Sequence, residues 1–142
     1  MTPTEELRAA ADKLRALVTA ASTATATPVE RDGKPTTEWH FAESRPGHGY
    51  LYAANPTGPG TRLMHADGPR TYPSMRTRHG AYAAAMDPAL GAALAGWLDA
   101  EAARLAATAH PGWHDTLASP HALAIARLIN GEPRSHSPLP DA

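Results

Sequence analysis

The sequence predicts an α+β fold with an N-terminal helix, a small antiparallel sheet and two C-terminal helices. Near both ends of the chain, apolar residues recur at three- and four-residue steps, as they do along an amphipathic helix. Between these segments, two short aromatic runs alternate with period two around a turn rich in proline and glycine, which is typical of a β-hairpin. Alanine marks the same division, because 31 of the 142 residues are alanine and 26 of these lie in or beside the helices.

The first helix is predicted to begin at Thr2 and to end near Ala21. Thr2 at the N-cap, Pro3 at the first helical position and Glu5 at the third fit a capping box. Its apolar side is expected to carry Leu7, Ala10, Leu14, Leu17 and Ala21. The apolar pattern then stops in the alternating threonines and alanines of residues 22–27.

A small sheet is predicted after the polar linker of residues 28–37. The run 38–41 (EWHF) alternates with period two, residues 45–49 (RPGHG) supply a turn, and residues 50–52 (YLY) alternate again. A loop containing two prolines and two glycines then leads to a candidate third strand over Thr61–His65.

The chain is predicted to become helical again after Gly80, with a short turn of helix over Ala81–Met86. Asp87 as N-cap and Pro88 as first residue start a longer helix that runs to about Ala107. Larger apolar residues mark one side of it: Leu90, Leu94, Trp97, Leu98 and Leu105. Its small residues, which would let another backbone approach closely, are Gly91, Ala92, Ala95, Gly96 and Ala102.

The last helix is predicted to begin at Ser119-Pro120 and to end at Asn130-Gly131. We therefore expect one α+β domain over residues 1–131, in which residues 28–80 form a variable insert of strands and loops. Residues 132–142 contain three prolines and no apolar periodicity, which predicts a disordered tail.

Composition excludes several classes of protein. The chain has no cysteine, so disulfides, thiolate zinc sites and cysteine nucleophiles are absent. A formal net charge of −1 argues against nucleic-acid binding by the whole surface. No apolar run approaches the roughly 20 residues that span a bilayer, and no signal peptide is recognisable. We expect a cytoplasmic protein without membrane contact.

The main candidate site is a basic stretch between residues 62 and 79, with four arginines against one acid, Asp67. Guanidinium groups match phosphate oxygens in shape and charge, so we predict a site for a nucleotide or another phosphate-bearing molecule. The predicted ligand-binding residues are Arg62, His65, Arg70, Tyr72, Arg76, Arg78 and His79. In the alternative interpretation, this is a solvated loop whose arginines pair with nearby acids. No cofactor is expected.

Two other classes of function stay open. The aromatic residues Trp39, Phe41, Tyr50 and Tyr52 are predicted to be mainly core, with an aromatic sheet face that stacks bases or a planar ligand as the functional alternative. An interaction module or protein–protein inhibitor would instead use this hairpin to hold a host protein. His110, His114 and His121 lie close in sequence with Asp115 beside them, which is one composition of a zinc-dependent hydrolase site. The Pro111-Gly112 break and the lack of a general-base glutamate argue against a metal there. Because no GxSxG elbow is present either, a non-enzymatic protein is favoured.

The small apolar volume predicts self-association. Leu, Ile, Val and Phe together number only 18 residues, which is too few for a thick core. Helices faced with alanine and glycine need a close neighbour, so we expect a homo-oligomer formed through the helix at residues 88–107.

Three helical segments resemble a group of small, uncharacterised proteins encoded by actinobacteria and by their phages and prophages. The segments are LRAAADKLRALVTAA (7–21), AYAAAMDPALGAALAGWLDAEA (81–102) and HALAIARLI (121–129) with Gly131. They match an N-terminal helix, a "HPxxxxALAxWLD"-like helix and a closing "HALAxARxxxG" helix. The insert at residues 28–80 lies outside the resemblance, so no site residue is carried over. The resemblance implies a phage-type accessory protein in the host cytoplasm, with anti-defence sequestration of a nucleotide signal or occlusion of a host protein as its role.

Overall fold

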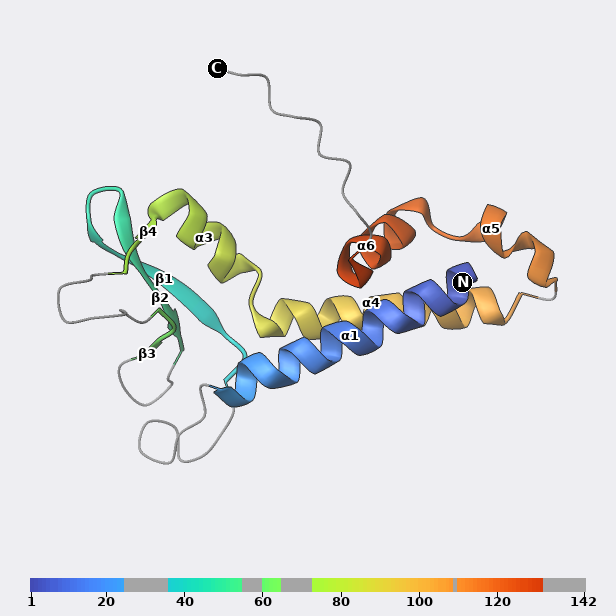
Figure 1. Cartoon of the computed structure of the whole chain (residues 1–142), viewed down its shortest axis with the longest axis horizontal. Helices are drawn as coiled ribbons and strands as arrows, with labels where there is room; N and C mark the ends of the chain where they lie inside the picture. The colour runs from blue at the N-terminus through green and yellow to red at the C-terminus, as the bar shows by residue number, and fades with distance from the viewer. Residues whose placement is uncertain (25–35, 55–59, 65–72, 109, 132–142) are drawn as a thin grey trace, which may run out of the picture. The chain divides into compact units, whose positions relative to one another are not determined.

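The computed structural model describes residues 1–24, 36–54, 60–64, 73–108 and 110–131 (Figure 1). In chain order the elements are α1 (Pro3–Ala24), β1 (Trp39–Arg45), β2 (His48–Ala53), β3 (Thr61–Arg62), β4 (Met75–Arg76), α3 (Thr77–Ala85), α4 (Pro88–Ala106), the 3-10 helix η1 (Pro111–Trp113), α5 (His114–Leu117) and α6 (Pro120–Asn130). Helices with a small antiparallel sheet confirm the predicted α+β class. The predicted linker at 28–37 falls mostly outside the described residues, and the predicted tail at 132–142 falls outside them entirely.

Two compact units make up the chain. One contains Met1–Leu14 and Leu94–Ala142, and the other contains Arg15–Ala93. None of the helices in the described part of the chain is long and apolar enough to cross a membrane.

The predicted capping box starts α1. The Thr2 backbone N donates to Glu5 Oε2 at 2.8 Å, and the Glu5 backbone N donates to Thr2 Oγ1 at 3.2 Å. The predicted end near Ala21 is wrong, because the helix continues to Ala24. In its last turns the Ser22 hydroxyl donates to the Val18 carbonyl at 2.5 Å, so a polar side chain sits within the helix by bonding back to its backbone.

Three other predicted helix ends are confirmed by their caps. Asp87 Oδ1 accepts from the Leu90 backbone N at 3.0 Å and starts α4. The Ser119 hydroxyl accepts from the Ala122 backbone N at 3.3 Å and starts α6. Gly131 ends α6 with a φ of 83°, a left-handed conformation that glycine adopts without strain.

The core of the first unit is thin and is built from α1, α4 and the segment that contains α6. Its largest fully buried side chains are Leu7, Leu98 and Leu105. Alanines surround these leucines and are also fully buried: Ala10, Ala11, Ala102, Ala122 and Ala126. Alanine adds little volume, so this core depends on a close approach of the helices around three leucines.

The predicted apolar sides of the helices are only partly buried. Leu17 is 55% exposed and Leu128 is 52% exposed, although both fall on apolar positions of the sequence pattern. Within the described part of the chain nothing approaches Gly96 closely, because an added Cβ there would meet nothing within 4 Å. A thin core buries only a narrow stripe of each helix. The periodic pattern includes every apolar position on that side, so it also includes positions that stay exposed.

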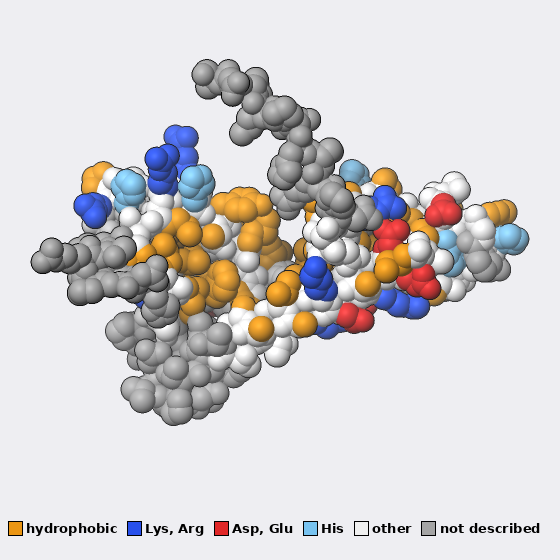
Figure 2. Space-filling model, viewed as in Figure 1, with side chains coloured by type: hydrophobic (Ala, Val, Ile, Leu, Met, Phe, Trp, Pro, Cys, Tyr) orange, Lys and Arg blue, Asp and Glu red, His pale blue; other side chains and the backbone are white. Residues whose placement is uncertain are grey.

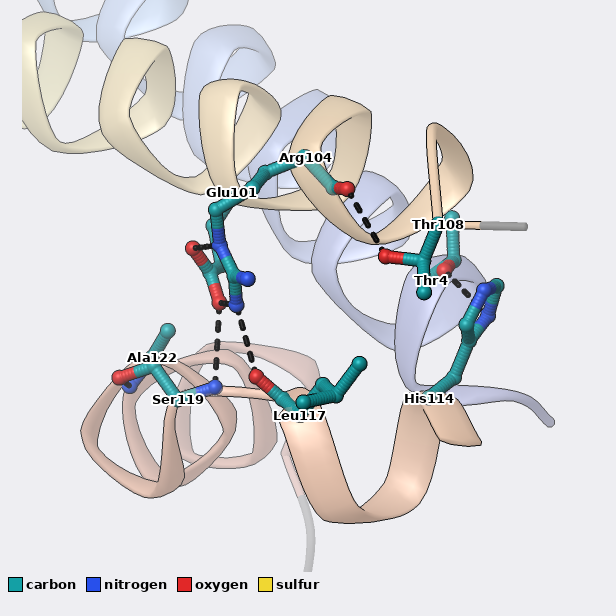
Figure 3. Close-up of polar contacts among 8 residues, drawn as sticks. All are labelled: Thr4, Glu101, Arg104, Thr108, His114, Leu117, Ser119 and Ala122. Atoms are coloured by element: carbon teal, nitrogen blue, oxygen red, sulfur yellow. Dashed lines mark hydrogen bonds and ion pairs between the residues drawn. The ribbon is translucent and has the colours of Figure 1, made fainter. Parts of the chain in front are cut away.

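A polar bridge connects α4 to the start of α6 (Figure 3). The Glu101 carboxylate accepts from Arg104 Nε at 2.9 Å, from Arg104 Nη2 at 2.6 Å and from the Ser119 backbone N at 3.1 Å. Arg104 Nη2 also donates to the Leu117 carbonyl at 2.7 Å. The Glu101 side chain is only 10% exposed, so its negative charge depends on these donors.

This bridge makes stability depend on pH. The hydrogen bond from Arg104 holds the pKa of Glu101 below its ordinary value of 4.5. A carboxyl whose pKa is lowered by folding stabilises the protein above its unfolded pKa, and this contribution is lost as pH falls through the folded pKa. We expect Glu101→Gln to lower the free energy of unfolding by about 1–2 kcal/mol at pH 7, and by less as the pH falls below that ordinary value. Urea unfolding at neutral and acidic pH measures both values.

A matched control for this prediction is Asp115→Asn, which removes an exposed carboxylate from α5 in the same unit. We expect it to change stability by less than about 0.5 kcal/mol at either pH. A loss for Glu101→Gln that stays the same at acidic pH would contradict the electrostatic account of the bridge.

The sheet of the second unit is antiparallel with β2 at its centre, which confirms the predicted hairpin. β1 pairs with one edge of β2, with Phe41 opposite Leu51. The turn between them has Pro46 followed by Gly47 with a φ of 83°, which suits the second and third positions of a type II turn.

Two short strands pair with the other edge of β2. β3 covers Thr61–Arg62, so within the described residues the predicted third strand over Thr61–His65 is shorter than expected. β4, Met75–Arg76, was not predicted, because a two-residue strand shows no periodicity. Both strands place basic residues at the sheet.

α3 covers the sheet face that carries Phe41. A Cβ added at Gly80 would lie 2.1 Å from Phe41 Cδ2, so glycine is what allows the helix to approach the ring. The helix starts at Thr77, whereas the sequence predicted helix only from Ala81, because a glycine this close to a helix start is typical of a break. The early start puts the first turn of α3 directly after β4.

A candidate anion site at the start of α3

The end of β4 and the first turn of α3 line a hollow of about 520 Å³. Its lining residues are Gly47, Arg76, Thr77, Arg78 and His79. Arg76 pairs with His48 in the sheet, and the Thr77 backbone N donates to the Gly47 carbonyl at 3.0 Å. The hairpin turn and the start of the helix are therefore joined by main-chain bonds, which fix one side of the hollow.

Basic side chains surround this hollow. Arg76, Arg78 and His79 are exposed, and none makes an ion pair or side-chain hydrogen bond within the described part of the chain. Figure 2 shows blue and pale-blue side chains together over the end of the sheet where α3 begins. Glu43 is an acid beside the hollow, and its Oε2 accepts from the Thr77 hydroxyl at 2.5 Å, so part of its charge is already engaged.

The helix start adds donors to the same place. Arg76 occupies the N-cap and makes no side-chain cap hydrogen bond, so the first turn of α3 lacks the acceptor that a serine or aspartate would provide. Backbone N–H groups at a helix start attract anions, because their partial positive charges are not cancelled within the helix. The Thr77 amide is already bonded to Gly47, so an anion in the hollow would have the amides of Arg78 and His79 and the guanidinium groups available to it.

The structure brings together three of the seven predicted ligand-binding residues. Arg62 lies on β3 instead, where its guanidinium carbon is 4.3 Å from the centroid of the Tyr50 ring. The other three predicted residues, His65, Arg70 and Tyr72, lie outside the described residues.

Sequence reasoning missed Gly47 and Thr77, which complete the lining. They are distant in sequence and meet only because β4 pairs with the start of β2. The sequence did show a turn at Pro46-Gly47. It did not show that this turn lies beside β4, because β4 itself was not predicted.

The predicted aromatic group is divided between the two faces of the sheet. Trp39 and Phe41 share the face toward α3, as the alternation predicts. Tyr50 and Tyr52 alternate with Leu51, so they lie on the opposite face and are half-buried. The pattern grouped all four as mainly core because it does not show which strand residues lie opposite one another.

The three histidines of the metal alternative make separate contacts. His114 Nδ1 lies 3.5 Å from the Thr4 hydroxyl (Figure 3), and the His110 ring stacks on Trp113 with 5.8 Å between centroids. His121 is exposed in the first turn of α6. Among the described residues, no three His, Cys, Asp or Glu side chains gather where they could hold a metal ion. The geometry gives the hydrolase alternative no support.

No family model, curated protein or solved structure matches this chain.

Proposed function

We propose that this protein is a non-enzymatic binding protein that holds a phosphate-bearing ligand in the hollow at the start of α3. The supporting observation is that Arg76, Arg78 and His79, all without an acidic partner among the described residues, line one hollow beside the uncapped first turn of a helix. Guanidinium groups bind phosphate through charge-assisted hydrogen bonds, and helix amides add further donors.

A nucleotide-sized ligand suits this hollow. Its volume of about 520 Å³ falls within the usual range of small-molecule sites, about 300–1,000 Å³. A role in sequestering a nucleotide signal in the cytoplasm of an actinobacterial or phage-infected cell remains part of the proposal, as the resemblance implies.

The direct test is a thermal-shift screen of nucleotides, cyclic dinucleotides and pyrophosphate. A ligand at 100 times its Kd should add about 2.7 kcal/mol to the free energy of unfolding. Arg76→Ala combined with Arg78→Ala should remove most of this gain, since both guanidinium groups line the hollow.

The matched control is Arg8→Ala combined with Lys13→Ala, which removes two exposed positive charges from α1. We expect this control variant to keep the full ligand-induced shift. No shift across the panel, or equal losses in both variants, would contradict a site at the hollow.

The predicted homo-oligomer through residues 88–107 remains a proposal. Trp97 in α4 is 43% exposed, and its side chain offers apolar surface for such a contact.

A further inference from the structure

The sheet face opposite α3 carries a row of aromatic and basic side chains, which we call the aromatic row: His40, Tyr50, Tyr52 and Arg62. Residues directly paired across antiparallel strands lie on the same face. His40 pairs with Tyr52, and Tyr52 pairs with Arg62, so one line of partners crosses three strands. Tyr50 lies two residues from Tyr52 along β2 and therefore shares this face.

The side chains of the aromatic row contact one another. The rings of His40 and Tyr52 are stacked with centroids 5.3 Å apart and an angle of 15°. Tyr50 meets Tyr52 edge to face at 6.4 Å, and Arg62 lies over the Tyr50 ring at 4.3 Å. His40 and Arg62 are exposed, whereas both tyrosines are half-buried. One face of the Tyr52 ring is covered by His40 and one face of the Tyr50 ring by Arg62, so a ligand would reach the remaining exposed parts of the row.

The aromatic row leads toward the hollow. At the start of β2, His48 pairs with Arg76, which places both residues on the same face as Tyr50. Arg76 also lines the hollow, so it belongs to both surfaces. Glu38 precedes β1 at the opposite end of this face, whereas Glu43 belongs to the face toward α3. The part of the face nearest the hollow is therefore basic and aromatic.

We propose that the aromatic row binds single-stranded nucleic acid, with bases against its rings and backbone phosphates at Arg62, Arg76 and the hollow. Rings on a sheet face stack with bases of any sequence, and nearby arginines neutralise the phosphates. Tyr52 lies four residues from His48 on β2, roughly 13 Å at the usual rise of a strand, and His48 pairs with Arg76 at the hollow, which favours an oligonucleotide over one nucleotide. A duplex is disfavoured because its bases are already stacked inside. This inference rests on the proposed function for the phosphate in the hollow and adds the class of ligand.

The same contacts also stabilise the sheet as cross-strand pairs, so the test must separate binding from stability. Fluorescence anisotropy of the full chain with labelled dT10 measures binding, and far-UV circular dichroism measures folding. We expect Tyr50→Ala combined with Tyr52→Ala to weaken dT10 binding about tenfold or more. Phenylalanine at both positions should keep most of the affinity, because the rings remain. Tyr82→Ala, which removes a 67% exposed ring from α3, is the matched control and should bind as the wild type does.

A second measurement does not require a folded variant. Ultraviolet cross-linking of dT10 to the wild-type chain, followed by peptide mass spectrometry, should place the adduct on the peptide that contains Tyr50 and Tyr52. An adduct found only elsewhere would overturn the inference.

The outcomes separate this inference from the proposed function. In one outcome, pyrophosphate stabilises the protein through Arg76 and Arg78 while dT10 does not bind, or binds equally after loss of both tyrosines. That result would support the phosphate site in the hollow and refute nucleic-acid binding by the aromatic row. If dT10 binding depends on the tyrosines but not on the two arginines, bases bind to the aromatic row, but the phosphate site at Arg76 and the hollow, and with it the proposed function, is refuted. Equal affinity for a 10-base-pair duplex would also overturn the inference, because paired bases cannot stack on the rings.

Discussion

Leu98→Ala is expected to lower the free energy of unfolding by about 2–5 kcal/mol. Leu98 is fully buried in α4 and is one of the three largest fully buried side chains of the described residues. Its neighbours in the core are mainly alanines, whose short side chains cannot move into the cavity that the substitution leaves. The loss therefore includes both the transfer of the leucine from water and the cavity left behind. Urea or thermal unfolding followed by circular dichroism measures it.

The matched control is Leu128→Ala on α6, because Leu128 is 52% exposed. We expect it to cost less than about 1 kcal/mol, since its side chain is already half in water. Similar losses for the two substitutions would contradict a core that depends on a few buried leucines.

Gly80→Ala is expected to destabilise the second unit by about 1–3 kcal/mol or more. The new Cβ would lie 2.1 Å from Cδ2 and 2.3 Å from Cε2 of Phe41, and 2.8 Å from its Cγ. An aromatic ring has no flexible end that could yield, so either α3 or β1 must move. Thermal unfolding, together with near-ultraviolet circular dichroism of the aromatic residues, would report both the lost stability and the displaced ring.

Gly96→Ala makes the same chemical change inside α4, where an added Cβ meets nothing within 4 Å. Alanine favours a helix over glycine by up to about 1 kcal/mol, so this substitution should stabilise the protein. If both substitutions stabilised it, the close contact between Gly80 and Phe41 would be refuted.

The features that could be predicted from the sequence are those decided by neighbouring residues. The capping box at Thr2, the caps at Asp87 and Ser119 and the hairpin turn at Pro46-Gly47 each depend on residues within one turn of the chain. Local hydrogen bonds set these features, so the residue types alone identify them.

The features that were missed depend on contacts between distant segments. β4 exists because it pairs with the start of β2, and α3 includes Gly80 because the Phe41 ring lies against it. In the same way, Leu17 has an apolar side chain at an apolar position and is still 55% exposed. Periodicity identifies the side of a helix but not whether another element covers it.

The candidate site shows the same division. Arg76, Arg78 and His79 were predicted together and lie together because they are consecutive or nearly so in the chain. Arg62 was predicted in the same group, but strand pairing places it over Tyr50 on β2. The separation of the tyrosines from Trp39 and Phe41 also required the register of the hairpin, which the sequence did not specify.

The most direct test of the central claim is a nitrogen-15 NMR titration of the full chain with pyrophosphate. If the hollow binds phosphate, the backbone amides of Gly47, Thr77, Arg78 and His79 should shift together and saturate, because they line it. The Arg76→Ala and Arg78→Ala double variant should lose these shifts. Saturable shifts confined to other residues, or no saturable shift at all, would contradict a phosphate site at the start of α3.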